Sequence, residues 1–178
     1  LEKYKTLMEK EKLEEEVRRL SITDDLTGLH NHRHFFKTLE GELTRSKRQK
    51  TSLSLLMFDL DNFKRYNDLN GHLEGDKVLK RIGEIVKHCI RFNVDSGYRY
   101  GGDEFSVLLI GASLDQALAI AERIRSSIEQ AEFQNITVSV GLSEFRDTYD
   151  LEGFVKSADD AMYMAKHSGG NQIHTNIP

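Results

Sequence analysis

The sequence has 178 residues and lacks the features that mark several large protein classes. A single cysteine, Cys89, excludes a framework of disulfide bonds and favours a reducing compartment. No apolar run approaches the length of a membrane span and no signal peptide is visible, so we expect a cytoplasmic domain without direct membrane contact. A net charge of −4 argues against a general nucleic-acid binder. It leaves a nucleotide ligand open, because a nucleotide needs only local positive charge and a metal ion.

The first 20 residues differ in composition from the rest of the chain. They are rich in Glu, Lys, Arg and Leu and contain no Gly or Pro, which predicts a helix over residues 1–20. Its apolar residues fit two heptad phases separated by a slip: Leu1, Tyr4 and Met8, then Leu13, Val17 and Leu20. Both a coiled-coil linker and a single helix packed on its own domain fit this pattern. We favour the coiled coil, because the helix is very polar outside its apolar stripe.

Residues 21–178 have the length of one domain. Amphipathic periodicity predicts helices over residues 32–47, 77–92, 114–129 and 151–167, and a short helix that Asp61 caps and that ends near residue 69. Apolar or alternating runs predict strands over residues 52–58, 98–100, 105–110, 136–140 and 172–174. The central strand pair reads as a tight hairpin, so we expect an α+β fold with a mostly antiparallel sheet flanked by helices.

Two glycines and two carboxylates follow one another in the centre of the chain. Gly101-Gly102 between strand-like runs predicts a hairpin turn, because glycine takes a positive φ without steric cost. The turn would present Asp103 and Glu104 at the edge of the sheet. Adjacent carboxylates repel each other unless a cation lies between them, and a divalent ion is the usual solution. A solvated acidic turn is the alternative that these residues alone leave open.

A second carboxylate, Asp59, follows the predicted strand 52–58. A carboxylate at the end of a buried strand is costly unless it is paired or bound to a metal. If this strand neighbours the hairpin, Asp59 and Asp103 meet at one sheet edge, as in a two-metal site for nucleotidyl transfer. The simpler interpretation is that Asp59 is an exposed polar residue beside a helix cap.

Other residues invite a chemical role less strongly. The histidines His30, His32 and His34 are close in sequence, but no carboxylate or cysteine lies at ligand spacing, so we do not favour a metal site there. Cys89 falls on the apolar stripe of its helix and is interpreted as a core residue.

Residues 98–105, Tyr-Arg-Tyr-Gly-Gly-Asp-Glu-Phe, resemble the signature of the GGDEF family of diguanylate cyclases letter for letter. Residues 24–33 resemble the opening motif of that family, with His32 where an arginine is usual. The resemblance extends over residues 21–174. It implies a fold related to polymerase palm domains and nucleotide cyclases, and the condensation of two GTP into cyclic di-GMP and two pyrophosphates.

The resemblance also implies roles for individual residues. It implies two Mg²⁺ (or Mn²⁺) ions per active site, held by Asp59, the Leu60 carbonyl and Asp103, with Glu104 supporting the metals or the deprotonation of the ribose 3′-hydroxyl. The residues implied to bind substrate are Asn62, Phe63, Lys64 and Lys166 at the phosphates, and Asn67 and Asp76 at the guanine, with His72 nearby. An acceptor such as Asp76 matches the N1–H and N2–H₂ donors of guanine, which adenine lacks.

Two positions depart from the family pattern. The inhibitory product site of the family is Arg-x-x-Asp, and here Phe92 replaces the arginine while Asp95 remains, so we expect this site to be absent. The family usually ends Lys-x-x-Gly-Arg-Asn, and here Gly170 replaces that arginine, which concerns triphosphate affinity rather than chemistry.

Two functions remain. The first is an active cyclase that works as a homodimer, because each GTP must attack the other. The second is a non-catalytic GTP-binding module that serves as a dimeric signalling spacer. We favour the enzyme, because the chain keeps Asp59, Asn67, Asp76, Asp103 and Glu104. The chain begins at Leu1 rather than methionine, so we expect an upstream sensor, or a membrane region that tethers the domain, to be missing from it.

Overall fold

The computed structural model describes residues 2–176. The predicted contributions of Leu1 and of the Leu20 side chain to the first helix, and of residues 177–178 to the domain, lie outside what is described. In chain order the elements are α1 (Glu2–Leu20), α2 (His32–Gln49), β1 (Leu53–Asp61), α3 (Phe63–Asn70), α4 (His72–Cys89), β2 (Ser96–Arg99), β3 (Glu104–Ile110), α5 (Leu114–Gln130), β4 (Thr137–Glu144), α6 (Leu151–His167) and β5 (Gln172–Thr175).

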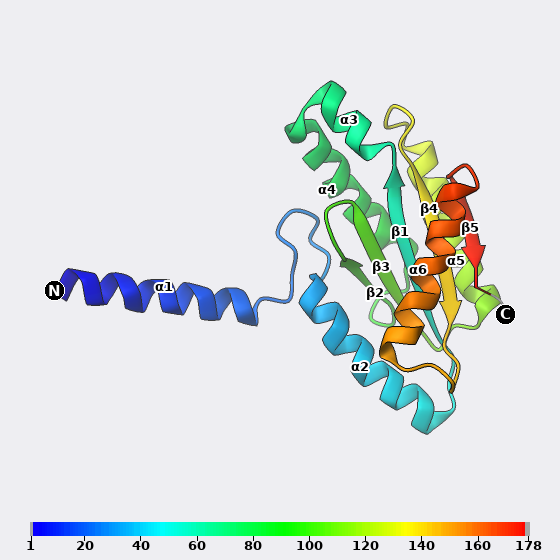
Figure 1. Cartoon of the computed structure of the whole chain (residues 1–178), viewed down its shortest axis with the longest axis horizontal. Coiled ribbons are helices and arrows are strands. Elements are labelled where there is room, and N and C mark those ends of the chain that lie inside the picture. Colours follow the sequence, from blue (N-terminus) through cyan, green and yellow to red (C-terminus); the bar gives the residue numbers. More distant parts are fainter. Residues whose placement is uncertain (1, 177–178) are drawn as a thin grey trace.

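The five strands form one sheet in the order β2-β3-β1-β4-β5 (Figure 1). Every neighbouring pair is antiparallel except β4 and β5, which are parallel, so the predicted α+β fold with a mostly antiparallel sheet is confirmed. β1 is the central strand, and all nine of its residues are buried. This explains why residues 55–58 form a continuous apolar run rather than an alternating pattern.

The side chains of β1 divide between two cores according to the period of two of a strand. Leu56, Phe58 and Leu60 pack with residues of α4 and α5 on one face of the sheet. Leu55 and Met57 pack with residues of α2 and α6 on the other. Alternation places Asp59 and Asp61 on this second face, the side that α6 covers.

Several boundaries differ from the sequence-based prediction. β1 continues three residues beyond Phe58, so Asp59 and Asp61 belong to the strand. α4 runs from His72 to Cys89 rather than from Lys77 to Phe92. The prediction that Asp61 caps α3 is wrong. Asn62 occupies the cap position with a φ of 64° and makes no side-chain cap hydrogen bond. The Asp61 carboxylate binds other partners instead.

α1 extends away from the domain (Figure 1). Its apolar side chains are exposed rather than packed on the domain: Tyr4, Leu7, Met8, Leu13 and Val17. The alternative in which this helix is ordered by its own domain therefore does not hold. Among residues 2–176, no helix has the length and apolar character needed to cross a membrane.

α6 lies unusually close to β4, and Gly141 makes this possible. A Cβ atom at Gly141 would overlap the backbone of Ala158 and Met162. Only glycine fits such an approach, so this contact fixes the height of α6 above the sheet.

The close contact predicts a large loss of stability for Gly141→Ala. We expect the free energy of unfolding to fall by about 3 kcal/mol, because backbone atoms of α6 must move away. Gly41→Ala is the matched control: Gly41 lies in α2 with open space around its Cα, so alanine should stabilise the helix by about 0.5–1 kcal/mol. Urea denaturation of both variants measures the difference, and a Gly141→Ala protein as stable as the wild type would contradict the packing.

Candidate functional site

The pairing of β1 with β3 brings the predicted carboxylates together. Asp59 lies directly opposite Glu104 in the antiparallel register, and the Leu60 amide donates to the Asp103 carbonyl at 3.2 Å. The sequence-based prediction that Asp59 and Asp103 meet at one sheet edge is thus confirmed by the strand register.

The turn before Asp103 forms as a β2–β3 hairpin, but for a different reason than predicted. Neither Gly101 nor Gly102 has a positive φ, so the expected left-handed glycine turn is wrong. Gly101 instead lies close to Glu104, since a Cβ there would be 3.3 Å from Oε2. Arg99 fastens the turn by donating two hydrogen bonds, of 2.9 and 3.1 Å, to the Gly102 carbonyl, and it also forms an ion pair with Asp24 at 3.3 Å.

Asp59 is a buried carboxylate whose charged form is disfavoured by its surroundings. It is 8% exposed, and its Oδ2 accepts a hydrogen bond of 2.9 Å from the Lys166 ammonium. Burial raises the pKa of Asp59 to about 6; the Lys166 hydrogen bond opposes the rise, and the charges of Asp103 and Glu104 add to it. Its Oδ1 atom is buried and has no hydrogen-bond partner among the described residues.

The side chains of this region supply only part of the ligand set of a divalent cation. Within residues 2–176, no three His, Cys, Asp or Glu side chains converge as a complete metal cage. Mg²⁺ is commonly bound by one or two carboxylates together with substrate phosphates, and it does not need such a cage. The unused Oδ1 of Asp59 and the facing Asp103 and Glu104 provide that kind of half-site.

Lys166 lies in the last turn of α6 and reaches the same place. Partial burial works to lower its pKa, but the hydrogen bond and charge of Asp59, with the charges of Asp103 and Asp61, leave the pKa of Lys166 raised. It therefore stays an ammonium at neutral pH. The prediction that this lysine serves the site agrees with its position.

Asn67 of α3 packs against Gly75 of α4, the residue before Asp76. The Asn67 amide lies so close to Gly75 that a Cβ there would overlap it. Its Oδ1 is buried without a hydrogen-bond partner in the described chain, and Asp76 follows Gly75 with its side chain exposed. His72 is the first residue of α4 and is exposed nearby. Sequence reasoning missed Gly75, although a glycine inside the first turns of a helix is itself a signal of close approach.

Asn62, Phe63 and Lys64 follow β1 directly and open α3. Phe63 is buried, whereas Asn62 and Lys64 are exposed. The side-chain amide of Asn62 donates to the Asn135 carbonyl at 3.1 Å, which connects the start of α3 to the loop before β4. The structure therefore places these three predicted phosphate-binding residues on the segment that leaves the Asp59 end of β1.

Asp95 serves a structural role in this chain. Its carboxylate accepts from the Arg91 backbone and guanidinium at 2.7–2.9 Å and from the Ile110 amide at 3.3 Å, and its side chain is fully buried. Phe92, at the position of the family arginine, is 88% exposed. The sequence showed the missing arginine at position 92, but it did not show that Arg91, one residue earlier, would pair with Asp95.

The three histidines lie among aromatic rings. The His30 and His34 ring centroids are 4.7 Å apart and both lie near Tyr98, while His32 meets Tyr100 edge-on at 4.7 Å. These contacts account for the histidines as packing residues behind the signature hairpin.

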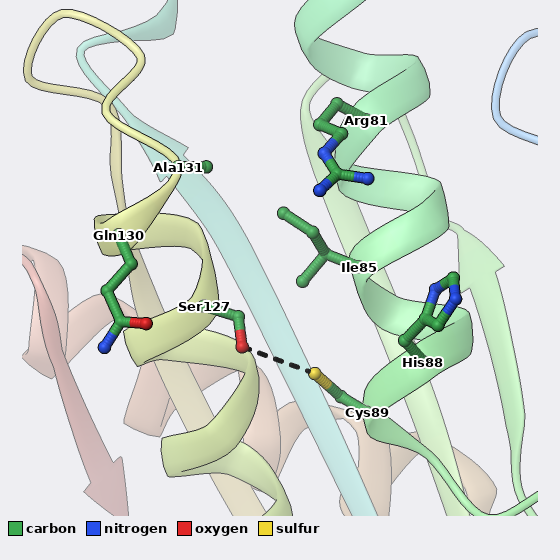
Figure 2. Close-up of a pocket in the computed structure, with 7 residues that line it drawn as sticks. All are labelled: Arg81, Ile85, His88, Cys89, Ser127, Gln130 and Ala131. Carbon is green, nitrogen blue, oxygen red and sulfur yellow. Dashed lines mark hydrogen bonds between the residues drawn. The ribbon is translucent and has the colours of Figure 1, made fainter.

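A separate cleft of about 390 Å³ opens between α4 and α5 (Figure 2). Cys89 lies at its edge, 4% exposed, with its Sγ 3.7 Å from the Ser127 hydroxyl. None of the predicted site residues lines this cleft. Cys89 belongs to the hydrophobic core, as its position on the helix predicted.

Comparisons with known proteins agree with the geometry. The family model described as diguanylate cyclase, GGDEF domain, matches residues 21–172. Diguanylate cyclase A of Treponema denticola is 40% identical over 166 residues, which cover 86% of this chain and 44% of the relative. Diguanylate cyclase DgcM of Escherichia coli is 35% identical over 170 residues, covering 94% and 41%. The chain thus spans less than half the length of these curated relatives.

Solved structures show the same fold. The coiled coil and GGDEF domain of DgcB from Caulobacter crescentus, in complex with c-di-GMP, superposes with a TM-score of 0.83 at 26% identity, covering 98% of this chain and 95% of that one. Diguanylate cyclase SiaD of Pseudomonas aeruginosa, in complex with its activator SiaC, gives 0.82 at 34% identity, covering 98% and 68%. The chain therefore belongs to the diguanylate cyclase GGDEF-domain family.

Proposed function

We propose that this domain condenses two GTP molecules into cyclic di-GMP and two pyrophosphates, the 3′-hydroxyl of each ribose attacking the α-phosphate of the other nucleotide. One observation carries the proposal: Asp59 is buried with an unused carboxylate oxygen directly opposite the Asp103–Glu104 hairpin. A fold does not dictate a reaction. A carboxylate kept at the cost of its burial does indicate chemistry that needs it.

We propose that Asp59, Asp103 and the Leu60 carbonyl hold two Mg²⁺ or Mn²⁺ ions together with the triphosphate. When bound, these ions supply the positive charge that makes the 3′-hydroxyl easier to deprotonate and neutralises the pyrophosphate. Glu104 lies opposite Asp59 and is half-buried. It is the side chain that either supports the ions or accepts the hydroxyl proton.

The positive charge for the triphosphate comes from two sides of this edge. Lys166 approaches Asp59 from α6. Lys64 and the backbone amides of Asn62 and Phe63 lie at the start of α3, where no side chain caps the helix. Amides at the start of a helix favour phosphate. The family arginine cannot simply be restored at position 170, because Gly170 has a φ of 73° and a Cβ there would lie 3.0 Å from the Asp61 carboxylate.

The metal-binding proposal predicts the effect of removing one carboxylate. Wild-type protein given GTP and Mg²⁺ should form cyclic di-GMP, and Asp103→Ala or Asp59→Ala should reduce the turnover number by about 100-fold or more, because positioned charge in the site is lost. Asp147→Ala is the control, because its exposed ion pair with Lys50 contributes little. Chromatographic quantification of the dinucleotide decides, and more than a few per cent of residual turnover in either site variant would refute the assignment.

We propose that Asn67 and Asp76 read the guanine base, with His72 beside them. The Asn67 Oδ1 atom is a buried acceptor without a partner in the described chain, and Asp76 adds an exposed acceptor next to it. Two acceptors suit the N1–H and N2–H₂ donors of guanine. Gly75, the residue before Asp76, leaves the space that the Asn67 amide occupies.

This arrangement predicts a change of base preference. Asp76→Ser should lower the ratio of kcat/KM for GTP over ATP by about tenfold or more, because guanine loses an acceptor that adenine does not use. Glu74→Ser, on the same turn of α4 and paired with Lys77, is the control and should leave the ratio unchanged. A competition assay with both nucleotides measures the ratio, and an unaltered preference in Asp76→Ser would remove Asp76 from the base-reading site.

We propose that the active species is a homodimer in which two domains face each other. One site binds one GTP, whereas the product joins two nucleotides through two bonds, so two-fold symmetry is required. The exposed apolar side chains of α1 offer a coiled-coil contact that would hold the domains together. The similar DgcB structure contains a coiled coil and the SiaD structure an activator, which supports control through an upstream sensor region. Because GTP is a cytoplasmic metabolite, we place the domain in the cytoplasm.

We further propose weak feedback by product. The Arg91 guanidinium donates to the buried Asp95 carboxylate and to the Ile110 carbonyl instead of a phosphate, and the exposed Phe92 supplies no guanidinium. Arg91, Phe92 and Asp95 line a cavity of about 470 Å³, but it lacks the arginine that the family motif has at position 92.

Both regulatory proposals are tested in one assay. Turnover should rise faster than linearly with dilute protein, and deletion of residues 1–20 should lower it at low concentration while leaving GTP affinity nearly intact. Added cyclic di-GMP should inhibit only weakly at micromolar concentration. Turnover strictly proportional to protein from nanomolar upward would contradict the dimer, and strong micromolar inhibition would contradict the loss of the product site.

A further inference from the structure

Asp61 lies two residues beyond Asp59 on the same face of β1, and the proposed reaction gives it no role. It is 9% exposed. Its Oδ2 accepts hydrogen bonds from the Thr137 hydroxyl at 2.7 Å and the Asn171 amide at 2.9 Å, and its Oδ1 accepts from the Ser139 hydroxyl at 2.6 Å. Both oxygens are therefore occupied by protein donors, unlike those of Asp59.

The Asn171 amide belongs to a turn, residues 168–171, that links α6 to β5. Gly169, Gly170 and Asn171 have φ values of 112°, 73° and 50° in succession. The two glycines adopt these values without steric cost, so Asn171 is the residue of the three whose left-handed backbone is unusual. The Asn171 side chain is also held from α5, accepting from Arg125 at 2.6 Å and donating to Glu129 at 2.7 Å. Asp61 and α5 thus grip the turn from two sides.

The turn is continuous with the end of α6 that carries Lys166. The Gly170 amide donates to the Ala165 carbonyl at 3.1 Å, which closes the turn onto the last residues of the helix. Lys166 itself is half exposed and donates a 2.9 Å hydrogen bond to Asp59. Its direction depends on the placement of the helix end below it.

We propose that Asp61 is a positioning residue for GTP: by clamping residues 168–171 to β1 it holds Lys166 where the triphosphate binds. The inference rests on the proposed function, because it assigns Asp61 a role toward that substrate. The clamp needs hydrogen-bond acceptors at Asp61 and does not need its negative charge, which distinguishes it from a metal ligand.

Steady-state kinetics separates these two roles. Asp61→Ala should raise KM for GTP about tenfold with a much smaller change in kcat, as expected when a hydrogen bond that orders a binding group is lost. Asp61→Asn should stay within about twofold of the wild-type KM, because its amide oxygen still accepts and its NH₂ group can donate to the Ser139 hydroxyl. An Asp61→Asn protein as impaired as Asp61→Ala would overturn the clamp in favour of a role for charge.

A second variant approaches the clamp from the turn and avoids the core. Gly170→Ala places a Cβ 3.0–3.3 Å from the Asp61 carboxylate and should raise KM for GTP. Gly111→Ala is its matched control, with a similar φ of 68° and nothing within 4 Å of the added atom, and should leave KM unchanged. Equal KM values in both variants would overturn the proposal.

Two further measurements complete the test. Lys166→Met should also raise KM, and combining it with Asp61→Ala should add little, because both act through the same ammonium; fully additive effects would overturn the clamp. Hydrogen exchange of the Asn171 amide needs no turnover and should accelerate about tenfold in Asp61→Ala. It should not accelerate in the control Ser143→Ala, which removes the buried Ser143–Ser157 hydroxyl contact from β4, the strand that also carries Thr137 and Ser139. Absent turnover in the wild type would refute the proposed function alone, whereas unchanged exchange would refute the clamp alone.

Discussion

The antiparallel register of β1 and β3 is the constraint on which the site depends. It places Asp59 opposite Glu104 and fixes the Leu60 amide on the Asp103 carbonyl. Because strand side chains alternate, a slip of one residue would turn Asp59 toward α4 and α5, away from Lys166. The apolar residues of β1, which are divided between two cores, make such a slip costly. Core packing and site geometry are therefore set by the same strand pairing.

The carboxylates gathered around Asp59 do not by themselves stabilise the folded state. Burial and two neighbouring carboxylates raise the pKa of Asp59, and Lys166 is the cation that approaches it. Asp61 has the same side chain on the same face of β1, but three donors satisfy it. Asp61 is thus satisfied within the protein, whereas one carboxylate oxygen of Asp59 has no partner among the described residues. Sites that bind charged ligands often retain such uncompensated groups.

The sequence was sufficient to predict the fold class and the hairpin of β2 with β3, because strand pattern and a short hairpin are local signals. The meeting of Asp59 with Asp103 was predicted on the condition that their strands are neighbours, and the pairing of β1 with β3 meets that condition. The placement of Lys166 near the site was implied by the family resemblance rather than by local pattern. The role of Asp61 was not predictable from local rules, because an aspartate before a helix is expected to cap it, whereas its partners Thr137, Ser139 and Asn171 lie 76 to 110 residues away. The contact of Asn67 with Gly75 depends on how α3 and α4 pack, which periodicity does not specify. The glycine turn was predicted from conformational freedom, yet Gly101 is needed for space beside Glu104.

The central claim is that the paired ends of β1 and β3 form the cation-binding half of the site. It can be tested by the paramagnetic broadening that Mn²⁺ causes in the backbone amide signals of the protein when GTP is present. We expect the amides of Leu60 and Glu104 to broaden first and those of the α4–α5 cleft around Cys89 not to broaden. Broadening centred away from the β1–β3 edge, or none at Mn²⁺ concentrations that saturate GTP, would contradict it.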